Sequence, residues 1–149
     1  MIPPVFDESE FPERLRRLVA MEIDRVIGDL ELRRDFLIEI WSRHRDRGPF
    51  IDTVFSRWKT LAMSDLALLD SEAAVACEAF YHELDELRFY FQFTQDMPTT
   101  MQDRYDDYLH RVAAYGALAM ELLGGAPARP VVEVFDDAAP QLTDLSGEE

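Results

Sequence analysis

The sequence predicts an all-α protein, an antiparallel bundle of four to five helices with an extended acidic C-terminal tail. Apolar residues recur every three or four positions through most of the chain, which is the period of one helix face. Glycine and proline are few, and most prolines lie near the ends. The 149 residues suit one domain. We expect a helical bundle at 12–125, an extended N-terminal segment at 1–11, and a proline-containing acidic tail at 126–149 that is extended or disordered.

The first predicted helical stretch covers residues 13–47. Its apolar side chains fall in one band at about 100° per residue. Gly48-Pro49 ends the stretch, because proline cannot continue a helix. Gly28-Asp29 predicts an internal break, since glycine often ends one helix and aspartate often caps the next.

Three further helices are expected. Residues 50–69 carry apolar positions at helical spacing, which predicts one continuous helix. Residues 71–95 and 100–123 each show a heptad-like apolar stripe. The short link at 95–99 makes these last two helices an antiparallel hairpin.

Charge restricts the partners of the chain. It has 30 acidic residues against 15 basic ones, a formal net charge of −15. Such a field repels nucleic acid and anionic lipid and favours basic proteins, peptides or metal ions. The same composition also fits simple solubility or adaptation to a salty cytoplasm. We therefore expect a protein partner, basic or amphipathic, and no nucleic acid.

The expected location is the cytoplasm. Cys77 is the only cysteine, which fits a reducing compartment. No apolar run approaches the ~18 residues of a membrane span, and the N-terminus lacks the layout of a signal peptide.

No familiar catalytic motif is present. The sequence contains no Gly-rich phosphate loop, no CxxC pair, no GxSxG elbow and no HExxH. Cys77 lies on an apolar stripe, which predicts a buried, unreactive thiol. These features favour a protein that is not an enzyme and needs no cofactor, but scattered side chains can also build a site.

Two carboxylate–histidine pairs form the sharpest alternative. Glu78/His82 and Asp106/His110 have i,i+4 spacing on the two helices of the predicted hairpin. Carboxylate and imidazole from facing helices hold metal ions in some bundles. However, the helical wheel points both histidines away from the seam between the helices, which instead predicts exposed intrahelical pairs. A metal site stays open as the alternative.

Polar residues on the apolar band of the first stretch have two interpretations. Glu22, Arg33 and His44 lie on or beside this band. Polar residues there mark either a pocket or the edge of the bundle.

Aromatic residues indicate a partner surface. Phe89 and Phe93 fall opposite the seam, where they either pack under another segment or form a groove or dimer surface. In the tail, an aromatic residue followed by acids suits an extended docking peptide. The predicted partner-binding residues are Phe89, Tyr90, Phe93, Phe135, Asp136 and Asp137.

The leading hypothesis is thus a non-enzymatic adaptor, regulator or dedicated chaperone that binds a basic or amphipathic protein segment. A metal- or cofactor-binding helical-bundle enzyme is the first alternative, and an inhibitor that mimics nucleic acid is the second. A homodimer is left open.

Overall fold

The computed structural model describes residues 10–124 and confirms the all-α fold class. This part of the chain forms five α-helices and one 3₁₀ turn, with no strand. The elements are α1 (Phe11–His44), α2 (Gly48–Thr53), η2 (Trp58–Thr60), α3 (Met63–Leu66), α4 (Ser71–Phe93) and α5 (Pro98–Leu122). The predicted tail, including Phe135, Asp136 and Asp137, lies outside the described residues, as does the N-terminal segment up to residue 9.

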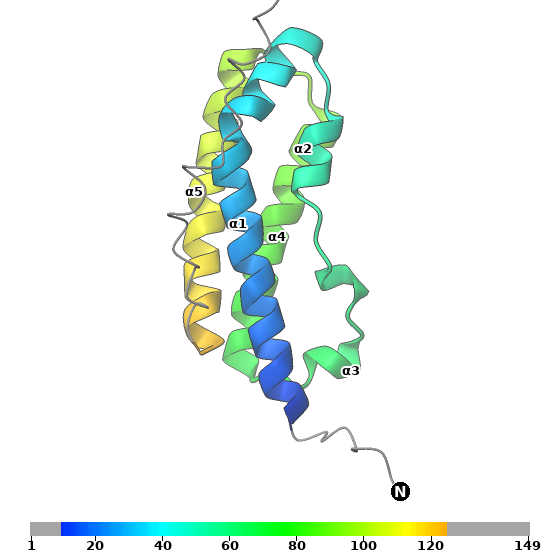
Figure 1. The fold of residues 1–149 in the computed structure, drawn as a ribbon, viewed down its shortest axis with the longest axis vertical. Helices are drawn as coiled ribbons and strands as arrows, with labels where there is room; N and C mark the ends of the chain where they lie inside the picture. Colours follow the sequence, from blue (N-terminus) through cyan, green and yellow to red (C-terminus); the bar gives the residue numbers. More distant parts are fainter. Residues whose placement is uncertain (1–9, 125–149) are drawn as a thin grey trace, which may run out of the picture.

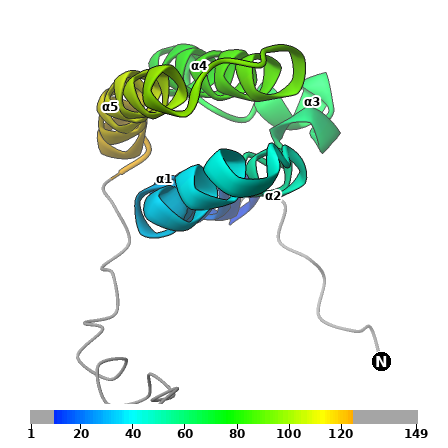
Figure 2. The ribbon, with the colours of Figure 1, turned by 90° about the horizontal axis from the view of Figure 1, so that it is seen from above.

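Three long helices form the body of the molecule. α1 and α4 run in the same direction, and α5 runs antiparallel to both (Figure 1). α1 and α2 lie in one layer, with α4 and α5 in the other (Figure 2). Residues 45–70 return from the end of α1 to the start of α4; we call them the second leg. The molecule is therefore an up-down-up-down bundle whose second leg contains only short helices.

The predicted break at Gly28-Asp29 is wrong, because α1 continues for 34 residues. Buried residues on both sides of the glycine, including Ile27 and Leu30, hold the helix against the rest of the bundle. Arg25 Nη1 also bonds Asp29 Oδ2 at 3.2 Å and spans the same turn. Packing along one face outweighs the weak local preference of glycine.

Aromatic side chains fill the half of the core that lies between the end of α1, α2, the end of α4 and the start of α5. We call this half the upper core. Tyr105 of α5 is fully buried, and its hydroxyl donates a hydrogen bond to the carbonyl oxygen of Leu30 in α1. Phe50 of α2 lies between Phe91, at 4.3 Å between ring centroids, and Trp41, at 6.2 Å. Burial of one such ring stabilises the fold by roughly 2–3 kcal/mol. This packing fixes α2 against the long helices.

The predicted continuous helix at 50–69 is also wrong. α2 ends at Thr53, whose hydroxyl donates to the carbonyl oxygen of Pro49 at 2.8 Å. Ser56 Oγ then accepts the backbone N–H of Trp58 at 3.0 Å. Side chains that bond nearby backbone groups compete with helical hydrogen bonds. The second leg therefore leaves the helical path after one and a half turns.

Gly116 lets α5 approach α1 closely. A Cβ atom at this position would lie 3.2 Å from Ile23 Cγ2 and from Phe80 Cε2, and would overlap the side chain of Ile27. Gly28, in contrast, has no atom within 4 Å of such a Cβ. The two helical glycines thus occupy opposite environments.

The same substitution at these two glycines is expected to change stability in opposite directions. Gly28→Ala should raise the free energy of unfolding by about 0.5–1 kcal/mol, because alanine favours the helix and meets open space. Gly116→Ala should lower it by about 1 kcal/mol, since overpacking exceeds the same helical gain. Urea unfolding measures both, and a gain for Gly116→Ala would contradict the close packing of α1 and α5.

Candidate functional site

A cleft of about 460 Å³ lies between the first half of α1 and the second leg, with α4 at its base. Its size falls within the usual range of ligand pockets. Most of the lining is apolar, and the charged groups are one carboxylate and two guanidinium groups. The lining residues are Leu15, Leu18, Val19, Met21, Glu22, Arg25, Arg57, Trp58, Thr60, Leu61 and Tyr81. We call this site the α1 cleft.

The path of the second leg creates the α1 cleft. Val54 is buried at the end of α2, whereas the next residue, Phe55, is 52% exposed. From there to α3 the chain forms no long helix (Figure 1) and contacts α1 and α4 through the side chains or backbone of Ser56, Arg57 and Trp58. A continuous helix at 50–69 would have covered this part of α1, so the break in the second leg and the cleft have one cause.

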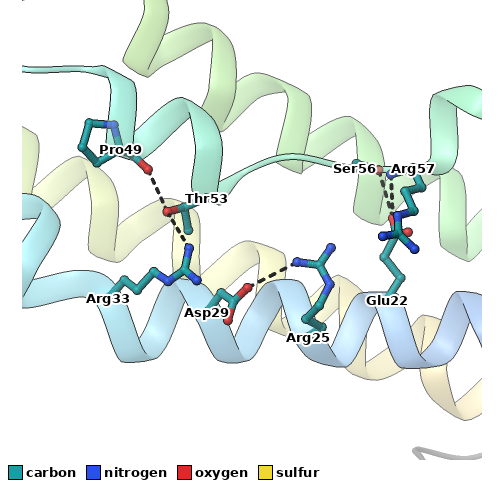
Figure 3. A network of polar contacts seen from close by, with 8 residues as sticks. All are labelled: Glu22, Arg25, Asp29, Arg33, Pro49, Thr53, Ser56 and Arg57. Carbon is teal, nitrogen blue, oxygen red and sulfur yellow. Dashed lines mark hydrogen bonds and ion pairs between the residues drawn. The ribbon is translucent and has the colours of Figure 1, made fainter.

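Glu22 of α1 fixes the second leg at the cleft. Its Oε1 accepts hydrogen bonds from Ser56 Oγ at 3.2 Å, from the backbone N–H of Arg57 at 3.1 Å and from the Tyr81 hydroxyl at 3.1 Å. Figure 3 shows the contacts of this carboxylate with Ser56 and Arg57. Burial, together with the negative charge of Glu22, raises the pKa of Tyr81. The phenol therefore stays protonated and remains a donor to Glu22.

Trp58 forms one wall of the cleft. Its ring stacks on Tyr81 with 4.5 Å between centroids and 12° between planes. Its Nε1 donates to Glu78 Oε2 at 3.1 Å. One carboxylate of the alternative metal site is therefore the acceptor of an indole N–H.

The four residues of the alternative metal site are not brought together. Asp106 is paired with Arg34 through two contacts, including Nη2 to Oδ2 at 2.7 Å. Hydrogen bonding by Arg34 lowers the pKa of Asp106. His82 and His110 are exposed. Within residues 10–124, no three His, Cys, Asp or Glu side chains lie where they would share a metal ion.

Cys77 is buried in the core, where the sequence places it. Burial raises the pKa of its thiol to about 12. The thiolate is the reactive form, so this cysteine has the properties of a core residue.

The phenylalanine pair, Phe89 and Phe93, is open to solvent. Their exposed fractions are 60% and 62%, and their ring centroids are 4.7 Å apart. No described segment covers them, so the second leg does not provide the cover considered from the sequence. Tyr90 differs from both: it is only 9% exposed, and its hydroxyl donates to Asp96 Oδ2 at 2.6 Å. Tyr90 thus does not share the surface of the pair.

Charge surrounds the phenylalanine pair unevenly. α4 carries five acidic residues and one arginine. Glu86, one turn before Phe89, is exposed, and Asp85 pairs with Lys59 of the second leg at 3.1 Å. An apolar pair on an acidic helix can receive apolar and basic groups together.

The sequence did not predict the aromatic wall of the cleft. Trp58 and Leu61 lie within the predicted continuous helix at 50–69, and Tyr81 has no predicted role. The signal that was available is Glu22, a carboxylate on an apolar band, which does line the pocket. Its donors come from the backbone and side chains of a distant segment, which spacing along the chain does not reveal.

Comparison of the chain with protein-family models, with curated proteins and with solved structures gives no match. Within residues 10–124, no helix has both the length and the apolar character to cross a bilayer.

Removal of the Glu22 carboxylate should release the second leg. Glu22→Ala is expected to lower the free energy of unfolding by about 1–2 kcal/mol, because three donors lose a charged acceptor. Amide hydrogen exchange at residues 54–62 should also become faster. Glu31→Ala, an exposed position on the same helix, is the control and should change stability by less than about 0.5 kcal/mol. Equal behaviour of the two variants would show that Glu22 does not hold the segment.

The Arg34–Asp106 pair should give a defined pH dependence. The native pKa of Asp106 is lowered, so the pair stabilises the fold above the unfolded pKa of about 3.9 and loses this effect as pH falls through the native pKa. Both side chains are partly exposed, so Asp106→Asn should lower the free energy of unfolding at pH 7 by only about 0.5–1 kcal/mol. The difference from wild type should narrow steadily as the pH falls below the unfolded pKa of about 3.9. Asp107→Asn, its exposed neighbour, should show no such trend in urea unfolding.

Proposed function

We propose that the protein is a non-enzymatic binding protein, an adaptor, regulator or dedicated chaperone, for a basic and amphipathic protein segment. The observation that carries this proposal is the exposed phenylalanine pair on acidic α4. Aromatic residues with a charged surround have the composition of interface hot spots.

The geometry of the pair suits a helical partner. Phe89 and Phe93 are four residues apart and lie on one side of α4, with their rings in contact. A partner helix that places apolar residues at i and i+3 or i+4 on this pair sets its flanking Lys or Arg beside Glu86 and its neighbours. Apolar contact then supplies most of the affinity, while charge steers the encounter.

The other two classes of function have less support. Glu78 and Asp106 already bind Trp58 and Arg34, so an enzyme built on the carboxylate–histidine pairs would have to break both contacts. A mimic of nucleic acid needs carboxylates spaced like phosphates over a long surface. α1, the longest helix, instead carries seven arginines and seven acidic residues.

A designed pair of peptides tests the proposal. One is an amphipathic helix of about five turns with leucine on one face and lysine on the other, and its counterpart has glutamate in place of lysine. By calorimetry we expect the lysine peptide to bind with a micromolar dissociation constant at low salt and about tenfold more weakly in 0.5 M salt. The glutamate peptide should not bind.

The Phe89→Ser/Phe93→Ser double variant should weaken binding of the lysine peptide at least tenfold. It keeps every charge of α4, so it separates apolar contact from non-specific attraction. Met63→Ser, at an 81% exposed residue of α3, is the matched control and should bind as wild type does. Equal binding of both peptides, or full binding by the double variant, would contradict the proposal.

A further inference from the structure

α1 carries a second apolar surface that its own bundle does not use. We call it the outer stripe, and its members lie within about 60° of one another around the helix axis. They are Leu18, Met21, Leu32 and Phe36, with exposed fractions of 63%, 49%, 83% and 57%.

The outer stripe faces away from the main core. α1 packs on α5 and lies in the layer opposite α4 and α5 (Figure 2). Within residues 10–124, no segment covers the stripe. Its lower end, Leu18 and Met21, also lines the α1 cleft. This end of the stripe is therefore continuous with the cleft, while the Arg25–Asp29 pair separates it from Leu32 and Phe36.

We propose that the outer stripe binds a second copy of this chain, with two α1 helices antiparallel about a two-fold axis near residue 27. The order of residues along the stripe is self-complementary about that point. Leu18 of one copy meets Phe36 of the second copy, and Met21 meets Leu32 of the second copy. Each apolar residue thus contacts an apolar residue in a closed, isologous interface.

Charge follows the same symmetry. Arg25 and Asp29 lie two residues before and two residues after position 27, so each arginine meets Asp29 of the second copy. Within one chain these two side chains pair with each other, with 3.2 Å between Arg25 Nη1 and Asp29 Oδ2 (Figure 3), and in the dimer each also lies opposite its counterpart. α1 as a whole is formally neutral, with seven arginines and seven acidic residues. It is thus a surface on which two chains of net charge −15 can meet with little repulsion.

Gly28 gives an independent reason for the position of the axis. Glycine in a helix interior costs roughly 1 kcal/mol relative to alanine, and no group within 4 Å in this chain needs the missing Cβ. In the proposed dimer Gly28 lies beside the axis, where two antiparallel helices come closest. A glycine there lets the two backbones approach.

The dimer also supplies an occupant for the cleft. With Leu18 at the cleft rim, Phe36 of the second copy lies at the cleft mouth. The stripe is about 25–30 Å long at 1.5 Å per residue, so the contact area falls at the low end for specific interfaces. We therefore expect a dissociation constant in the micromolar range.

Sedimentation of the full chain from 1 to 500 µM tests the proposal. Wild type should shift from monomer to dimer with concentration, and Leu32→Ser/Phe36→Ser should raise the dissociation constant more than tenfold while keeping the far-UV circular dichroism of wild type. Met63→Ser and Phe89→Ser/Phe93→Ser are controls that should leave the dimer intact, which separates this surface from the one on α4. If the chain stays monomeric at every concentration, the proposal is overturned, even where another molecule is found to cover the stripe.

A charge exchange tests the pairing itself. Arg25→Asp brings like charges together in its own dimer, as does Asp29→Arg, so each variant alone should dissociate more than tenfold more readily. An equimolar mixture should recover the dimer, because every facing pair is again opposite in charge. A mixture that stays as monomeric as its components overturns the proposed contact.

Gly28→Leu distinguishes an effect on dimerisation from an effect on folding stability. Leucine should raise the midpoint of thermal unfolding by a few degrees, measured at monomer concentrations, because it favours the helix. The same change should weaken dimerisation more than tenfold by separating the backbones. Unchanged dimerisation of this more stable variant overturns the placement of the axis.

Discussion

The structure depends on one tertiary constraint: the Glu22 carboxylate decides where the second leg runs. Residues 50–69 have the apolar spacing of a helix, and in isolation this spacing would favour one. Glu22 instead binds Ser56 and the backbone of Arg57, with the phenol of Tyr81 as a third donor. A partly buried carboxylate needs such partners, and the second leg provides them by leaving the helical path. The position of Trp58 and the shape of the cleft depend on these contacts.

The fold class was predictable because it rests on long, periodic segments. α4 and α5 occur close to their predicted bounds, since a long apolar stripe at helical spacing fits a helix and no other regular element. The predictions that are wrong lie where local sequence preference and tertiary packing disagree. Gly28 indicates a break, yet packing on both sides keeps α1 continuous. Of the predicted partner surface, the sequence placed Phe89 and Phe93 opposite the seam, but it could not show that Tyr90 turns inward to Asp96, six residues further on.

Charge is distributed by element rather than evenly. α4 has an excess of four acids, whereas α1 balances its arginines and acidic residues. The net charge of −15 is a total over the whole chain and describes neither of these helices. This distribution allows one small bundle to offer two surfaces of different selectivity, one for basic segments and one for a neutral, apolar helix. Composition alone, which gives a single total, does not separate them.

The two tryptophans lie in different parts of the fold, so fluorescence can follow each part separately. Trp41 is 4% exposed in the upper core, and its Nε1 donates to the carbonyl oxygen of Asp96. Trp58 stacks on Tyr81 in the lower half, on the segment that Glu22 holds. Detachment of that segment would expose one indole to water and leave the other in place. The intrinsic emission of the chain thus contains separate signals for local opening and for loss of the whole fold, and a variant lacking either indole would isolate the remaining one.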